Sequence, residues 1–245
     1  MQKLKKIVLF ICLIVTPAAS WAQNMRTYNV SSGLSANAIK GIVQDDRGYI
    51  WFGSNDGLNV FNGKEFKSYG CSYQPSGENS ISALSIMDVS KHKDGRQIWV
   101  GTQSSSIYLF NPNEESFKEI ILKDSNNRTQ TPNLCYSLTY DKNGRLWIGT
   151  DIGLYVYDED KELIYCHSIE NSSLPSNSIH SVFCDSKGTI WIGTSKGLLK
   201  YNAATDKFTS IKTAKGYSGY KGEIHITTIA EDDAENIWLG TWDGR

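Results

Sequence analysis

Short apolar stretches separated by turn residues make up most of this chain. In the first such unit the pattern predicts strands over Ile39 to Gln44, Tyr49 to Ser54, Leu58 to Phe61 and Glu65 to Tyr69. The segments between them are rich in Asp, Asn and Gly, which is typical of tight turns between antiparallel strands. Helical repeats would need amphipathic stretches of about 12 residues, which this sequence lacks. The pattern therefore predicts an all-β chain built from units of four short antiparallel strands.

One local pattern, a tryptophan with an apolar residue before it and a glycine two residues after it, occurs five times. The tryptophans recur at intervals of 48, 48, 44 and 47 residues. A four-stranded unit at this period is the blade of a β-propeller. Because an indole buries a large apolar area, we expect these side chains to form the core between blades. They are Trp51, Trp99, Trp147, Trp191 and Trp238.

An aspartate stands six residues before four of these tryptophans. Three of the four begin an Asp-x-x-Gly turn, in which the carboxylate accepts amide hydrogen bonds and glycine supplies a positive φ. A calcium site needs six or more oxygens in one place, and one Asp per separate blade does not converge. We interpret the four as turn caps and expect no metal and no cofactor. They are Asp45, Asp141, Asp185 and Asp232.

Repeats two and five depart from this turn pattern. In repeat two the turn glycine, Gly95, is displaced by one position, and in repeat five Glu235 replaces the glycine. We expect altered turns in these two blades.

The first 22 residues have the pattern of a signal peptide. Three lysines precede an apolar run over Ile7 to Val15, which is too short for a bilayer that needs about 20 residues. The small residues at the end of the segment predict cleavage between Ala22 and Gln23. The expected organisation is a signal peptide over 1–22 and a partial propeller over 23–245, exported to the periplasm.

Charge and cysteine content narrow the function classes. The net charge is -1, so we expect no basic surface for a nucleic-acid backbone. The four cysteines after the leader have no zinc-ligand spacing. Buried thiols are the simpler interpretation, and disulfides in an oxidising compartment remain open. These cysteines are Cys71, Cys135, Cys166 and Cys184.

Two strings resemble the two-component regulator propeller repeat. One runs from Leu174 to Leu198 around Asp185 and Trp191, and the other from Gly33 to Leu58 around Trp51. The resemblance implies the periplasmic sensor region of a Bacteroidetes-type hybrid two-component histidine kinase, with an oligosaccharide as ligand. It also implies propellers that are commonly seven-bladed and paired, followed by a membrane span and a kinase. This chain carries no kinase sequence boxes, so we expect no catalysis from it.

About four and a half blades fit into 23–245, and the last unit stops in the turn at Gly244. Met25 to Val30 resembles the outermost strands, so we expect it to close the last blade. We therefore interpret the chain as a fragment whose partners are the remaining blades and the kinase portion. An isolated fragment of this kind is expected to self-associate, for example as a dimer.

The long connections between blades are the expected ligand-binding loops. The connection over Thr213 to Ile224 combines aromatic faces, which stack on sugars, with charged groups that can orient hydroxyls. Its candidate ligand-binding residues are Tyr217, Tyr220, Lys221 and Glu223.

Two other function classes stay open. An exported propeller enzyme, a lyase or glycosidase, would need converging catalytic groups, and the histidines fall one per repeat in repeats two to five. Paired carboxylates meeting at the propeller axis would also serve such an enzyme. A protein-interaction propeller would instead expose large apolar patches.

Overall fold

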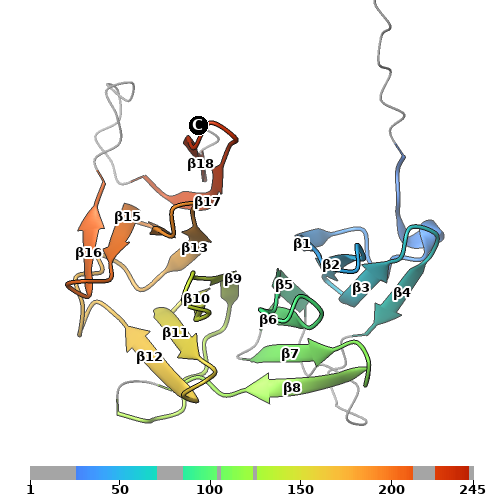
Figure 1. The fold of residues 1–245 in the computed structure, drawn as a ribbon, viewed down its shortest axis with the longest axis horizontal. Helices are drawn as coiled ribbons and strands as arrows, with labels where there is room; N and C mark the ends of the chain where they lie inside the picture. Colours follow the sequence, from blue (N-terminus) through green and yellow to red (C-terminus); the bar gives the residue numbers. More distant parts are fainter. Residues whose placement is uncertain (1–25, 71–84, 104–105, 124–125, 212–223, 243–245) are drawn as a thin grey trace, which may run out of the picture.

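The chain folds into sheets that follow one another around an open ring (Figure 1). The structure, a computed structural model, describes residues 26–70, 85–103, 106–123, 126–211 and 224–242. In this part of the chain there are four sheets of four antiparallel strands and one sheet of two. The first strands of successive sheets contact one another along the inside of the ring. This is the blade arrangement of a β-propeller, so the predicted fold class is confirmed.

Each four-stranded blade is a meander in which consecutive strands pair in order. Blade 1 comprises β1 (Ile39–Gln44), β2 (Ile50–Ser54), β3 (Gly57–Phe61) and β4 (Phe66–Tyr69). Blade 2 comprises β5 (Ser85–Lys91), β6 (Ile98–Gln103), β7 (Ile107–Asn111) and β8 (Ser116–Ile120). Blade 3 comprises β9 (Cys135–Tyr140), β10 (Leu146–Thr150), β11 (Leu154–Asp158) and β12 (Leu163–His167). Blade 4 comprises β13 (Ile179–Cys184), β14 (Ile190–Thr194), β15 (Gly197–Asn202) and β16 (Lys207–Ser210), and blade 5 contains β17 (Ile226–Glu231) and β18 (Ile237–Thr241).

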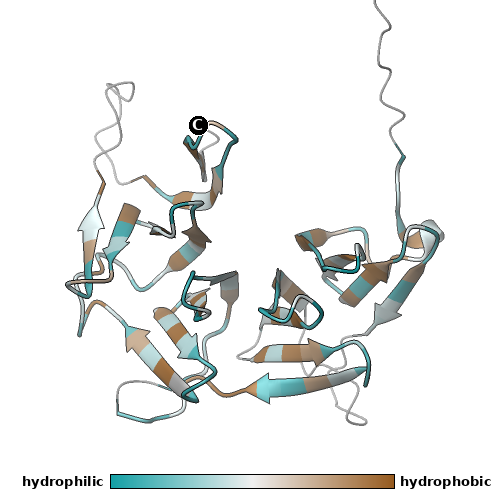
Figure 2. Ribbon diagram, in the orientation of Figure 1, coloured by the Kyte–Doolittle hydropathy of each residue, from teal (hydrophilic) through white to brown (hydrophobic). Residues whose placement is uncertain are grey.

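The middle strands of blades 2 and 3 are buried on both faces because neighbouring blades cover them. Every residue of β10 and β11 is buried. In Figure 2 apolar residues gather in the strands, whereas the turns between them are polar. Such continuous burial explains why these strands read as apolar runs and not as an alternating pattern.

In blades 1 to 4 the glycine two residues after the tryptophan lies where the next blade packs closely. A Cβ atom on Gly53 would come within 2.5 Å of Ile86 Cγ2, and one on Gly149 within 2.8 Å of the Ile179 carbonyl oxygen. Both contacts come from the inner strand of the following blade. The repeated Trp-x-Gly pattern therefore encodes blade stacking: the indole fills the space between blades and the glycine lets two backbones approach.

Burial of the repeat tryptophans depends on the blade that follows. Trp51, Trp99 and Trp147 are at most 1% exposed and lie in hydrophobic clusters shared with the next blade. Trp191 is partly buried against β17 and β18 residues. Trp238 differs from the expected core position, since it is 64% exposed. Its side chain lies on the last described sheet, where no further described sheet packs on it.

The segment before β1 does not form the expected closing strand. Residues 26–29 have no regular structure, and Val30–Ser32 form a single turn of 3-10 helix. The prediction of a strand over Met25 to Val30 is therefore wrong for the described residues. The Val30 amide bonds to the Asn37 side chain at 2.9 Å instead of to a neighbouring strand, and Gly33 ends the turn with a φ of 106°.

The described cysteines carry free thiols. Cys135 is buried beside Gly101 of blade 2, and burial raises the pKa of its thiol far above the ordinary value. Cys166 and Cys184 are partly buried. Cys71, like the predicted signal peptide with Ala22 and Gln23, lies outside the described residues. In the described part of the chain no helix is long and apolar enough to cross a membrane.

Candidate ligand-binding site

The recurrent aspartates bind both a turn and an indole. Asp141 Oδ1 accepts the amide hydrogens of Asn143 and Arg145 at 2.9 and 3.0 Å, while Oδ2 accepts the Trp147 indole N–H at 2.9 Å. The same indole bond is found from Trp51 to Asp45, from Trp191 to Asp185 and from Trp238 to Asp232, at 3.1, 2.9 and 2.8 Å. The six-residue spacing thus places the carboxylate beside the indole, which ties the turn to the core.

The turn at repeat five shows how the missing glycine is replaced. Glu235 occupies the glycine position with a φ of 63°, where the other repeats have a glycine. Hydrogen bonds from Asn236 and Trp238 lower the pKa of Asp232 to about 2.

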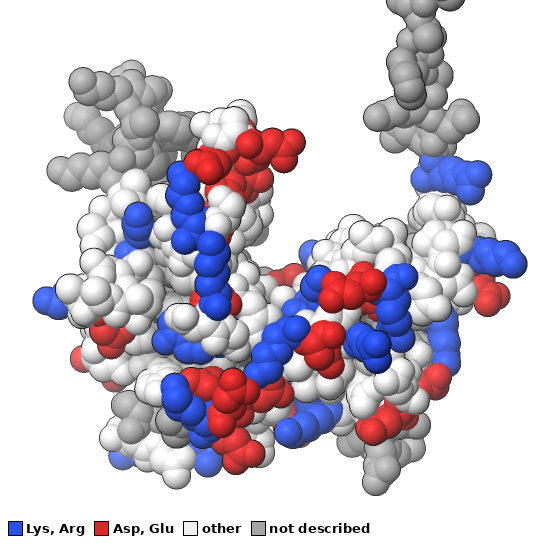
Figure 3. Space-filling view, in the orientation of Figure 1, with Lys and Arg blue, Asp and Glu red and all other residues white. Residues whose placement is uncertain are grey.

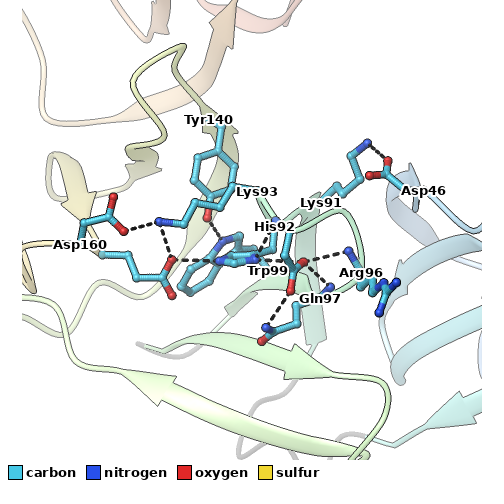
Figure 4. A network of polar contacts seen from close by, with 11 residues as sticks. Asp46, Lys91, His92, Lys93, Arg96, Gln97, Trp99, Tyr140 and Asp160 are labelled. Carbon is cyan, nitrogen blue, oxygen red and sulfur yellow. Dashed lines mark hydrogen bonds and ion pairs between the residues drawn. The ribbon is translucent and has the colours of Figure 1, made fainter.

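Repeat two replaces this Asp–Trp bond by contacts between blades (Figure 4). His92 occupies the aspartate position, and its Nε2 lies 2.9 Å from Glu159 Oε2 of blade 3. The Trp99 indole N–H donates instead to the Tyr140 hydroxyl at 2.7 Å, also in blade 3. Lys93 adds an ion pair with Asp160 at 2.6 Å. In repeat two, with its displaced Gly95, side-chain contacts therefore join blades 2 and 3. We call the interface between two neighbouring blades a seam, and these contacts across it the clasp.

The charged groups around these turns are paired. Lys91 reaches Asp46 of blade 1 at 2.6 Å, and Lys187 reaches Glu235 of blade 5 at 2.5 Å. Figure 3 shows acidic and basic side chains side by side on this face, without a large area of one sign. Such a surface joins neighbouring blades and offers no broad field for a polyanion.

A repeated β-bulge begins every inner strand. In each blade one residue of the inner strand has no partner in the second strand, which makes the strand bend and re-aims its side chain. These extra residues are Lys40, Met87, Tyr136, His180 and Thr227.

Aromatic rings form a row across blades 3, 4 and 5 at this bulged end of the inner strands. The rings of Tyr136 and His180 have centroids 4.5 Å apart, and those of His180 and His225 are 4.1 Å apart. The Trp242 indole continues the row, stacked on His225 at 5.6 Å. We call these four residues the ring row. It is carried by two bulge residues, the residue before β17 and the residue after β18.

Two members of the ring row, His180 and Tyr136, are uncharged at neutral pH. Burial, and next the charge of His225, lower the pKa of His180 to about 4. Burial also raises the pKa of Tyr136 above its ordinary value. The His180 Nε2 is held at 3.0 Å from the Ser178 hydroxyl. His180 and Tyr136 thus present uncharged rings, and the His180 ring is held in place by a hydrogen bond.

The ring row also contains a buried polar atom without a partner. His225 Nε2 is inaccessible and has no hydrogen bond among the described residues. Buried polar atoms are nearly always paired, so an unpaired one points to a partner from outside. The predicted loop with Tyr217, Tyr220, Lys221 and Glu223 lies outside the described residues, but it leads directly into Ile224 and His225.

A buried acid on the inner strands has a structural partner. Burial raises the pKa of Asp88 to about 7, although its carboxylate accepts the amide hydrogens of Val89 and Leu138 at 2.9 and 2.8 Å. The second bond joins blade 2 to blade 3. Within the described residues, no three side chains able to ligate a metal gather in one place.

Comparison with known proteins identifies the repeat. The model of the family described as "Two component regulator propeller" matches residues 33–56, 130–151 and 173–196. Three segments of the chain are therefore similar to the two-component regulator propeller repeat. The matched segments run from the inter-blade connection through the inner strand and the Trp-x-Gly strand, which are the elements that carry the bulge, the turn and the blade contact.

Solved structures share this propeller fold. The extracellular domain of BT4673 from B. thetaiotaomicron, described as a hybrid two component system, aligns with a TM-score of 0.69 and 23% identity over 85% of this chain. PorZ, a surface component of the type-IX secretion system of Porphyromonas gingivalis, aligns with a TM-score of 0.65 and 15% identity over 90% of this chain. Virginiamycin B lyase from Staphylococcus aureus aligns with a TM-score of 0.60 and 15% identity over 85% of this chain.

These alignments cover different shares of the other proteins. The chain spans 26% of the BT4673 domain, 34% of PorZ and 68% of the lyase. At such identities the likeness establishes the fold. Among curated proteins no sequence matches this chain.

Proposed function

We propose that this chain is part of the extracytoplasmic input module of a hybrid two-component system, and that it binds an oligosaccharide without changing it. The observation that carries the proposal is the ring row at the bulged ends of β9 and β13. Four neighbouring rings of this kind offer stacking faces for sugar rings, and repeated propeller blades hold them rigidly.

The hydrogen-bonding chemistry of the row supports a neutral, hydroxyl-rich ligand. A neutral imidazole has one N–H donor and one acceptor nitrogen, which matches a sugar hydroxyl that both donates and accepts. In this proposal ligand hydroxyls bond the polar groups at the edge of the row, and Tyr136 and Trp242 stack on neighbouring sugar rings. The family of the repeats, together with the predicted leader, supports the periplasmic location and the signalling role.

Calorimetric titration with a panel of neutral oligosaccharides tests this function. We expect saturable binding by the wild type, and a loss of at least about tenfold in affinity for Tyr136→Ala and for His225→Ala. The Tyr217→Ala and Tyr220→Ala double variant should weaken binding as well if that loop contributes. Tyr165→Ala, which removes a more exposed tyrosine from the outer strand β12, is the control and should bind as the wild type does.

A chemical analysis separates this function from an exported enzyme. The oligosaccharide recovered after long incubation should have an unchanged mass. A shorter or unsaturated product would contradict binding without catalysis, and titrations that show no binding to any oligosaccharide would contradict the ligand class.

A further inference from the structure

The seam between blades 1 and 2 contains a cavity of about 430 Å³ on the side of the ring opposite to the ring row. Its walls include Arg47, Tyr49, Phe66, Lys67, Tyr69 and Pro112. The volume falls in the range of small-molecule binding pockets. From its chemistry, described below, we propose that this cavity is a second ligand site that binds one neutral sugar ring.

The cavity exists because this seam lacks the clasp found at the next seam. At the seam between blades 2 and 3, His92 bonds Glu159, the first residue after β11. The corresponding residue after β7 is Pro112, which has no polar side chain to cross the seam. The residue corresponding to His92 is Asp45, which turns toward Trp51 of its own blade. The seam between blades 1 and 2 therefore lacks a counterpart of the contact between His92 and Glu159.

The aromatic walls supply the stacking surface. Tyr49 is 39% exposed, and the Arg47 guanidinium lies over its ring, 5.0 Å from the centroid. Tyr69 packs at 6.4 Å from Trp51 with nearly parallel rings, and Lys67 Nζ lies 5.2 Å from the Tyr69 ring centroid. Phe66 and Pro112 add apolar surface. The C–H face of a sugar ring is the complement of such a wall, since aromatic faces carry partial negative charge and C–H groups partial positive charge.

The polar groups of the cavity are fixed before a ligand arrives. Asp45 Oδ2 accepts the Nε and Nη2 hydrogens of Arg47 at 3.1 and 2.8 Å. A guanidinium has five N–H groups, so this arrangement holds the side chain while leaving further donors that can meet hydroxyl oxygens. Ordering this side chain in advance lowers the entropic cost of binding.

The charge balance favours a neutral ligand over an acidic one. Arg47 is paired with Asp45, and Lys67 is paired with Glu115 of blade 2. Glu65 is a further acid on the wall. Because both cations are already compensated, a carboxylate or sulfate on the ligand would lack an unpaired partner. This site does not rest on the ring row, which lies at the other end of the strands.

Saturation-transfer NMR with methyl hexopyranosides tests the site, using methyl glucoside, galactoside and mannoside as probes and methyl glucuronide as the acidic counterpart. We expect saturable binding of at least one neutral glycoside. Tyr49→Ala, and Pro112→Glu, which introduces the residue of the neighbouring seam, should each weaken it at least about tenfold. Asn113→Glu adds the same charge at the next, exposed position and should leave binding unchanged. All of these variants are made in a Tyr136→Ala background, which removes the contribution of the ring row to the signal.

The outcomes separate this site from the proposed function. In the Tyr136→Ala background, neutral glycoside binding that Tyr49→Ala removes supports the second site even if no oligosaccharide binds the ring row. Glycoside binding that is lost entirely in Tyr136→Ala alone, tighter binding of the glucuronide than of every neutral glycoside, or no saturable signal from any probe would overturn it. Equal urea midpoints for Tyr49→Ala and wild type show that a loss of binding is not a loss of folding.

Discussion

Replacing Gly149 by alanine tests the way in which the blades stack. The new Cβ would lie 2.8 Å from the Ile179 carbonyl oxygen and 3.0 Å from Ile179 Cγ2. The carbonyl belongs to the backbone of β13 and cannot move aside without shifting that strand. Overpacking of this kind costs about 1–3 kcal/mol. Against it stands a gain of about 0.4–1 kcal/mol, because alanine restricts the unfolded chain.

Taken together, these two effects should lower the free energy of unfolding by about 1–2 kcal/mol. For a chain of this size that corresponds to a fall in Tm of about 2–8 °C. Urea unfolding followed by tryptophan fluorescence measures it, since Trp147 lies in the same seam. Gly70→Ala is the matched control, because nothing lies within 4 Å of a Cβ at that position. We expect Gly70→Ala to be neutral or slightly stabilising. If Gly149→Ala were as stable as Gly70→Ala, the explanation of the Trp-x-Gly pattern would be refuted.

Three further predictions concern stability. Trp147→Ala should cost about 3–5 kcal/mol, whereas Trp238→Ala, at an exposed position, should cost less than about 1 kcal/mol; equal urea midpoints for the two variants would contradict the assigned burial. Because the pKa of Asp232 is lowered to about 2, its contribution to stability is present above pH 4 and is lost as the pH falls toward 2. A carboxyl NMR titration should place its midpoint near 2, and an ordinary midpoint near 4 would argue against the hydrogen bonds from Asn236 and Trp238. Because the pKa of His180 is lowered to about 4, the folded state should lose stability as the pH falls from about 6.5 toward 4, and His180→Gln should flatten that part of the urea-midpoint profile.

Much of the fold is predictable from the sequence because its repeat is local. The strands expected in the first unit match β1 to β4 within one residue at each boundary. Local spacing also places Asp45 at the start of its turn, although the bond between its carboxylate and the Trp51 indole emerges only in three dimensions. The expected strand before β1 fails because strand pairing needs a partner, which residue pattern alone does not reveal.

The ring row is harder to predict because its members come from different positions of the repeat. Tyr136 and His180 are both the second residue of an inner strand, whereas His225 precedes its strand and Trp242 follows one. An alignment of the inner strands could have revealed part of the ring row from the sequence. It places Tyr136 and His180 at the same position, where blades 1 and 2 have Lys40 and Met87. The histidines fall one per repeat in sequence, yet closure of successive blades brings the His180 and His225 rings to 4.1 Å.

The most direct test of the account is a titration of the chain with neutral oligosaccharides, followed by mass analysis of the recovered ligand. The account predicts saturable binding that Tyr136→Ala and His225→Ala weaken, with the oligosaccharide returned intact. Binding unaffected by both variants, or an oligosaccharide returned cleaved, would contradict it.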